Sequence, residues 1–196
     1  MFSSKRSRVR ALAVVGMAAV AAGVGTVTYQ ASAAEVAARP TPAPDFSAPA
    51  IPDLIKPPAG SHPLGAYVVT AGTQNYTCVV AAGATTGAYT GASVPEAQLI
   101  GAGGRIHHFA GPSWQSERDG SLVTATKIGA SARTGAIPEL LLQVATHSGK
   151  GILSKADYIN RLATSGGVAP TDSCTAGQTV SVPYKAVYLF WDAPAA

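Results

Sequence analysis

The sequence predicts an all-β fold, a single-domain antiparallel sandwich or barrel with an extended proline-rich N-terminal arm. Two observations lead to this prediction. Most segments after residue 63 alternate apolar and polar residues, which is the period of a β-strand with one buried face. Glycine-containing turn sequences separate these segments, as at Asp119-Gly120 and Gly166-Gly167. About 130 residues follow the arm, a length that suits one domain.

Six segments are expected to be strands because they are short, rich in β-branched and aromatic residues, and bounded by turn signals. They are residues 65–71, 74–80, 105–109, 121–128, 140–146 and 179–191. Gly72 and Thr73 are expected to form a tight turn between the first two. In the last segment, alternate residues from Val180 to Phe190 share one face, and Pro183 indicates an edge strand or a bulge.

Residues 154–163 allow two interpretations. Ser154 can cap a helix with Asp157 in the capping-box position, but the same residues also fit a strand. Arg161 in this segment either pairs with Asp157 across one helical turn or faces a pocket. We expect the solvated ion pair, which is the commoner arrangement for such residues.

Residues 1–33 have the features of a secretory signal peptide. Four basic residues before position 11 precede an apolar run over 11–27, and small residues at 31–33 allow cleavage after Ala33. A membrane anchor is the alternative, but the run barely reaches spanning length. We therefore expect a secreted, extracellular protein that meets the membrane only transiently, through its signal peptide. Residues 34–63, rich in proline and alanine, are expected to form a disordered linker, and residues 64–196 the β-rich domain.

The net charge of the chain comes from the predicted signal peptide. The full chain has 14 Lys and Arg against 10 Asp and Glu, a formal charge of +4. The four basic residues before position 11 account for this excess, so the chain after cleavage is formally neutral. A nucleic-acid partner needs a basic face or stripe, and we expect no such partner here.

Two cysteines, Cys78 and Cys174, are expected to form a disulfide, because an exported protein matures in an oxidising compartment. The bond would close a loop of roughly a hundred residues and contribute roughly 4–5 kcal/mol in the chain-entropy model. Two free thiols or a metal pair are the alternative, but a Cys-x-x-Cys spacing is absent.

The stretch from His107 to Ser121, HHFAGPSWQSERDGS, concentrates the chemically active side chains. A hydrolase would use Ser113 or Ser121 as nucleophile, His108 as base and Asp119 to orient the base. A Gly-x-Ser-x-Gly motif is absent, and closeness in sequence does not make a triad. An extracellular hydrolase around His108 is therefore the alternative rather than the main expectation, and enzymatic activity is not the expectation.

A metal site could draw on His107, His108 and His147 together with Asp119 or Glu117. Adjacent residues on a strand point to opposite faces, so the two neighbouring histidines cannot easily share one ion. A diagnostic ligand spacing is also lacking. We expect no metal.

A binding patch is the third functional interpretation of this stretch. Trp114 offers a flat apolar face, and Gln115 and Arg118 offer polar groups to fix a ligand, a combination common in binding sites. A carbohydrate or cell-wall ligand would suit an exported β-rich domain, by analogy of fold alone.

A purely structural interpretation competes with all three. His108 would bond to the backbone, and Trp114 would be a buried anchor whose ring nitrogen finds a carbonyl. Residues 111–112 would break a strand, and Asp119-Gly120 would be a hairpin turn. We favour this interpretation for most of the stretch.

Four groups of residues in order resemble a known family. They are residues 72–78 (GTQNYTC), 108–114 (HFAGPSW) with 119–121 (DGS), 137–142, and 158–161 (YINR) with 164–170 and Cys174. This set is similar to the secreted bacterial and fungal proteins of domain-of-unknown-function family 3455, over roughly residues 63–191. The resemblance implies an exported single domain and no established activity.

Some fungal relatives carry a malate dehydrogenase name, so a nicotinamide cofactor has to be tested on the residues. The nearest match to a dinucleotide motif is residues 101–106 (GAGGRI), in which Ile106 stands where Gly or Ala is needed. A helical pattern does not follow it, and the positions about 20 residues after its last residue, 124–126, hold Thr and Ala instead of an acid. We expect no cofactor, and a binding or structural domain of unknown ligand.

Overall fold

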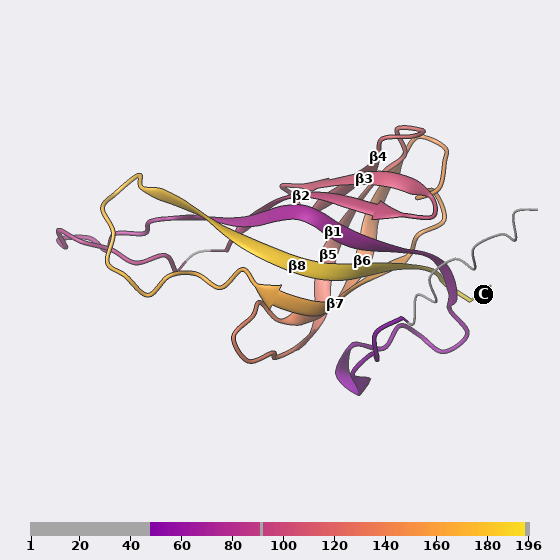
Figure 1. Ribbon diagram of the computed structural model, residues 1–196, viewed down its shortest axis with the longest axis horizontal. Helices are drawn as coiled ribbons and strands as arrows, with labels where there is room; N and C mark the ends of the chain where they lie inside the picture. The colour runs from indigo at the N-terminus through magenta and orange to yellow at the C-terminus, as the bar shows by residue number, and fades with distance from the viewer. Residues whose placement is uncertain (1–47, 91, 195–196) are drawn as a thin grey trace, which may run out of the picture. The chain divides into compact units, whose positions relative to one another are not determined.

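The computed structural model describes residues 48–90 and 92–194, and these residues fold into one closed antiparallel β-barrel. Each strand pairs with the next one along the chain, and the last pairs with the first (Figure 1). The strands are β1 (His62–Thr77), β2 (Val94–Gly101), β3 (Gly104–Phe109), β4 (Ser113–Ser116), β5 (Leu122–Ser131), β6 (Glu139–Ser148), β7 (Tyr158–Gly166) and β8 (Thr179–Asp192). The predicted all-β class is confirmed, and of the two architectures expected it is the barrel.

The barrel interior holds the main hydrophobic core. Alternate residues of each strand point inward, and their buried side chains form one cluster across all eight strands. Its largest fully buried members are Trp114, Tyr188, Phe190, Leu99 and Ile106. The cluster fills one part of the barrel, and the remaining part contains the cavity described below.

Strand β1 runs through the position at which a tight turn was expected. Gly72 and Thr73 lie inside the strand, where its ladder with β2 shifts register between Val69 and Ala71. A Cβ atom at Gly72 would come within 2.9 Å of three side chains, those of Val69, Ala97 and Tyr184. The glycine therefore permits a close approach at a bulge in a bent strand, and the predicted turn is wrong.

Pro183 of β8 lies at the same irregular region. The ladder between β7 and β8 ends at Gly166 and Tyr184, so Pro183 lies where β8 has a strand partner on one side only, which is a local edge as expected. Pro183 pairs with Thr73, where the ladder between β1 and β8 resumes after a register shift. The extra residue at this shift lies in β1 and not in β8, so of the two positions expected for this proline the structure supports the edge.

The segment over residues 154–163 is not a helix. Its second half belongs to β7, which pairs with β6 on one side and β8 on the other. Ser154 bonds to the carbonyl of Gly151 in the preceding loop instead of capping a helix. Hydrogen bonds from two neighbouring strands outweigh the weak helical preference of so short a segment.

The disulfide between Cys78 and Cys174 is present, as expected. It joins the residue after β1 to the connection between β7 and β8, and its sulfurs lie in a small separate cluster with Tyr76 and Tyr89. The adjacent ends of β1 and β8 pair with each other over Thr73–Thr77 and Thr179–Pro183 and extend past the other strands (Figure 1).

The end of the predicted linker packs on the barrel. Residues 48–61 are described, and they include a 3₁₀ turn, η1 (Asp53–Ile55). Ile55 is fully buried against Leu141, Leu162 and Leu189 on the outer face of the sheet. This part of the arm is therefore ordered against the domain.

The predicted signal peptide and residues 34–47 lie outside the described residues. Within the described part of the chain, no helix is both long and apolar enough to cross a bilayer.

Candidate functional site

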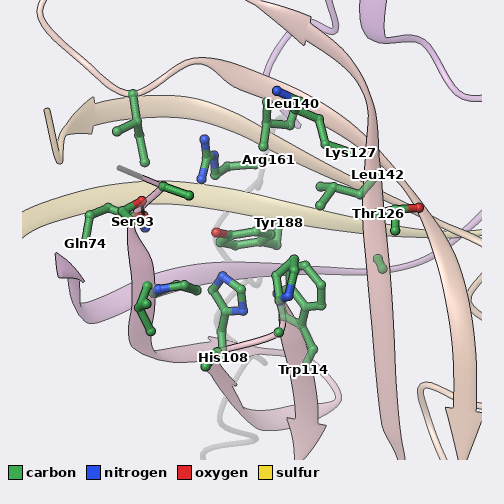
Figure 2. Close-up of a pocket in the computed structure, with 18 of the residues that line it drawn as sticks. Gln74, Ser93, His108, Trp114, Thr126, Lys127, Leu140, Leu142, Arg161 and Tyr188 are labelled. Atoms are coloured by element: carbon green, nitrogen blue, oxygen red, sulfur yellow. Dashed lines mark hydrogen bonds between the residues drawn. The ribbon is translucent and has the colours of Figure 1, made fainter. Parts of the chain in front are cut away.

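A cavity of about 700 Å³ lies inside one end of the barrel. This end, which we call the open end, carries the connections after β1, β3, β5 and β7. Exposed residues at those connections form its mouth, among them Ala92, Ala110, Gly111 and Pro138. Side chains from β3, β4, β5, β6, β7 and β8 converge on the space (Figure 2).

The cavity wall is mostly apolar and contains few polar groups. Trp114, Ala125, Leu140 and Leu142 supply apolar surface from three consecutive strands. The polar side chains are Gln74, Tyr76, Ser93, His108, Thr126, Lys127, Arg161 and Tyr188. Two of these are cations, and no Asp or Glu lines the cavity in the described part of the chain.

His108 is held inside the barrel by a ring stack and a hydrogen bond. Its ring stacks on Trp114 with centroids 4.3 Å apart and planes 6° apart. Its Nδ1 lies 2.8 Å from the carbonyl oxygen of Ser113, and because a carbonyl only accepts, Nδ1 carries the proton. Burial, reinforced by the charge of Arg161, lowers the pKa of His108 to about 3. The ring is therefore neutral at physiological pH, with Nε2 as an acceptor.

Arg161 points into the barrel from β7. It occupies an inward position opposite Leu140 of β6 and Tyr188 of β8. Its Nε and Nη2 atoms both donate to the carbonyl oxygen of Pro138, at 3.2 and 2.9 Å. The ion pair expected with Asp157 is not formed, because Asp157 lies in the β6–β7 connection and accepts from the backbone of Ala193.

The charge of Arg161 has no ionic partner in the described residues. The ion pairs there involve other side chains, namely Lys56 with Asp53, His107 with Glu96, and Arg133 with Glu139. The alternative interpretation from the sequence, an arginine that faces a pocket, is the one the structure supports.

Tyr188 lies between Arg161 and His108 in the close-up view (Figure 2). It is fully buried, its hydroxyl lies 3.3 Å from that of Tyr184, and its ring contacts His108 edge-on. Burial raises the pKa of the Tyr188 phenol, although the charge of Arg161 opposes this rise. The phenol therefore stays protonated and can donate a hydrogen bond.

Two buried donors at the cavity have no acceptor among the described residues. They are Nε2 of Gln74 and Nε1 of Trp114. The Gln74 amide is close enough to Tyr184 to oppose the rise in that phenol's pKa, but Nε2 has no oxygen at hydrogen-bonding distance and angle. Oε1 of Gln74 accepts from the hydroxyl of Ser93. The carbonyl partner expected for the Trp114 ring nitrogen is absent, and that expectation is wrong.

The residues suggested for a hydrolase are not brought together. Asp119 and Ser121 lie in the β4–β5 connection, at the end of the barrel opposite the open end. Asp119 accepts hydrogen bonds from the backbone and hydroxyl of Ser121 and from the backbone of Ile152. These bonds, the one from the Ser121 hydroxyl first, lower the pKa of Asp119 to about 2. Asp119 and Ser121 thus connect the β4–β5 loop to the β6–β7 loop by hydrogen bonds, whereas His108 lines the cavity.

The three residues suggested for a surface patch also separate. Trp114 is buried in the barrel, whereas Gln115, its neighbour on β4, is exposed on the outer face. Arg118 lies in the turn after β4. Alternation along the strand places the aromatic ring and the polar groups on opposite sides of the wall.

The histidines considered for a metal site point in different directions. His107 pairs with Glu96 on the outer face, at 2.6 Å, and His147 bonds to the carbonyl of Ala156. In the described residues, no group of three His, Cys, Asp or Glu side chains is placed to hold an ion.

Sequence reasoning missed Gln74 and gave Arg161 the wrong environment. The signal for Arg161 was available in the strand interpretation of 154–163. Ile159 and Arg161 have the same parity, so a buried Ile159 places the arginine on the inward face. Gln74 was missed because a turn was expected at Gly72, so residues 65–71 and 74–80 were treated as two strands and not as the single strand β1.

The fold and the cavity together define the class of this protein, an eight-stranded antiparallel β-barrel domain with a partly polar internal pocket. A family model described as Protein of unknown function (DUF3455) matches residues 101–192, slightly less than half of the chain, and supports the resemblance to this family. The matched range runs from the end of β2 to the end of β8 and includes His108, Trp114, Arg161 and Tyr188. Neither the curated proteins nor the solved structures contain a match to this chain.

Proposed function

We propose that this chain is an exported small-molecule-binding protein whose ligand occupies the barrel cavity. The cavity itself is the observation that carries this proposal. Its volume of about 700 Å³ falls within the range of roughly 300–1,000 Å³ typical of ligand pockets. Its apolar wall with a few converging polar groups is the composition such pockets have.

Binding suits the site better than hydrolysis. A general base works best with a pKa near the operating pH, and the pKa of His108 is held at about 3. Carboxylates that could orient this histidine are absent from the cavity lining in the described residues. His108 therefore acts as part of the binding wall, stacked on Trp114 and fixed by its bond to Ser113.

We propose this internal site in place of the outer aromatic surface at which the sequence led us to expect a glycan. Trp114 is 1% exposed, and its ring faces the interior of the barrel, where it lines the cavity. A saccharide held on the outside would not contact it.

Export is supported by the composition of residues 1–33 and by the disulfide, a bond that persists in oxidising compartments. Mass spectrometry of protein from the culture medium should find an N-terminus at Ala34. Retention of Met1 in that material would contradict the proposal.

Fluorescence of the neutral probe N-phenyl-1-naphthylamine tests occupation of the cavity. Leu142→Trp places a larger ring in the cavity, and Gln143→Trp places the same ring on the exposed face one residue further along β6. We expect saturable binding by the wild type and by Gln143→Trp, and a loss of at least about tenfold in affinity for Leu142→Trp.

Ala125→Leu fills the same cavity with an aliphatic side chain instead of an indole, and it serves as a second variant if Leu142→Trp fails to fold. Circular dichroism confirms that each variant retains its strands. Equal binding by a folded cavity-filling variant, or saturable binding by none of the proteins, would overturn the proposal.

A further inference from the structure

The ligand of this cavity is an organic anion, and we infer that it is a small carboxylic acid with an apolar body, held through its carboxylate by Arg161. This inference rests on the proposed function and specifies its ligand class. It follows from the charge of the cavity, the free donors of Arg161, and the excess of donors over acceptors around it.

The cavity has an uncompensated positive charge. Arg161 points inward, has no ionic partner in the described residues, and shares the cavity with Lys127 at the mouth and with no carboxylate. Arg161 is half-buried, and a cation partly removed from water without a partner carries a free-energy penalty. An anion in the cavity would remove that penalty, whereas a neutral ligand would not.

The guanidinium of Arg161 is also oriented in advance for binding a carboxylate. Its Nε and one N–H of Nη2 are occupied by the carbonyl oxygen of Pro138, which fixes the plane of the group. The other N–H of Nη2 and both of Nη1 make no hydrogen bond of good geometry in the described residues, although the guanidinium lies close to the Tyr188 hydroxyl. These N–H groups form the fork that binds a carboxylate through two parallel hydrogen bonds. A bond to the backbone that fixes the fork in advance lowers the entropy lost on binding.

The neighbouring polar atoms are mainly donors. Gln74 and Trp114 are 2% and 1% exposed, and each has a donor without an acceptor in the described part of the protein. The acceptors are fewer than the donors: they are Nε2 of His108 and the hydroxyl oxygens of Ser93 and Tyr76, whose protons are donated to Gln74 and to the carbonyl of Gly167. A ligand rich in acceptors satisfies such a set better than one rich in donors.

The rest of the cavity requires an apolar body. Ala125, Leu140, Leu142 and the ring of Trp114 line the wall, so an alkyl or aryl group attached to the acid is buried there. Removal of that apolar surface from water supplies affinity, at about 25 cal/mol per Å² before the costs of association are subtracted.

Displacement of N-phenyl-1-naphthylamine by decanoate and by decan-1-ol tests this inference, since the two competitors share one alkyl chain and differ in charge. At pH 7.5 we expect decanoate to displace the probe at a concentration at least about tenfold lower than decan-1-ol, as for a charge-assisted hydrogen bond. In Arg161→Gln the ratio should fall to about one while the probe still binds.

Lys185→Gln is the matched control, because it removes a cation from the outer side of β8. It should keep the wild-type ratio. Equal displacement by both competitors in the wild type would overturn the inference and leave the proposed cavity binding intact, whereas absence of probe binding would overturn both. If Arg161→Gln loses the probe as well, Arg161→Lys decides: a retained preference for decanoate supports the inference, and its loss refutes it.

Discussion

At the scale of single residues, His108 is a titratable side chain buried inside the barrel. It is 2% exposed, stacked on Trp114, and bonded through Nδ1 to a carbonyl oxygen. An imidazolium in this position would lose its hydration and lie near the positive charge of Arg161. The structure therefore holds His108 in its neutral form over a wide range of pH.

This environment predicts that the protein loses stability as the pH falls. The pKa of His108 is about 3 in the folded state and about 6.5 in the unfolded chain. Between these values the unfolded state binds one more proton than the folded state, so the free energy of unfolding decreases on acidification, by up to about 1.4 kcal/mol per pH unit. His108→Gln removes this titration, and urea unfolding at pH 7.0 and 4.5 should show a smaller difference than in the wild type.

His62→Gln is the control for this measurement, because His62 is exposed at the start of β1. It should retain the wild-type pH dependence. An unchanged pH dependence in His108→Gln would show that another group is responsible. Asp119 acts in a lower window, because its pKa of about 2 lies below its ordinary value, and its stabilising effect is lost as the pH falls below about 4.

At the scale of elements, η1 stabilises the outer face of the barrel. Ile55 is 0% exposed, and its carbonyl oxygen accepts a hydrogen bond of 2.8 Å from the amide of Asn160. The same amide bonds to the carbonyl of Leu140, and its oxygen accepts from the indole of Trp191. A short turn is thereby connected to three strands.

Truncation of the side chain that anchors this turn should destabilise the whole domain. Ile55→Ala is expected to lower the free energy of unfolding by about 2–4 kcal/mol, because it removes a fully buried side chain. Leu54→Ala, at a position 78% exposed, should change it by less than about 0.5 kcal/mol. Urea denaturation measures both. Similar values for the two variants would mean that η1 does not contribute to the core.

At the scale of the whole molecule, the disulfide and strand closure act on the same part of the barrel. The bond between Cys78 and Cys174 spans 96 residues, from the end of β1 to the approach to β8, and these two strands close the barrel. All strands from β2 to β7 lie within the loop that it closes. The cross-link therefore restricts most of the chain in the unfolded state.

Removal of this cross-link should cost about 4–5 kcal/mol, the loop-entropy value for a closure of this length. The double variant Cys78→Ala, Cys174→Ala is expected to unfold at a correspondingly lower urea concentration than the wild type. Wild-type protein measured with excess reductant should approach the variant, and the variant itself should not respond to reductant. A variant as stable as the oxidised wild type would show that the loop is already constrained without the bond.

The sequence by itself determined the all-β class and the disulfide, because alternation, residue type and turn chemistry are local properties. Burial of Trp114 and the backbone bond of His108 were predictable for the same reason. Gly72 led to the wrong prediction of a turn, because glycine is favoured both in tight turns and at β-bulges.

Only the tertiary structure decided that the strands close into a barrel and that the barrel keeps a cavity. Closure depends on the pairing of β1 with β8, which are separated by most of the chain, and no local pattern encodes that contact. The same closure brings Gln74, His108 and Arg161, from three strands, around one space, and sends Asp119 and Ser121 to the opposite end. The alternation along a strand shows which of its side chains share a face. Which strands face each other across a barrel depends on long-range pairing.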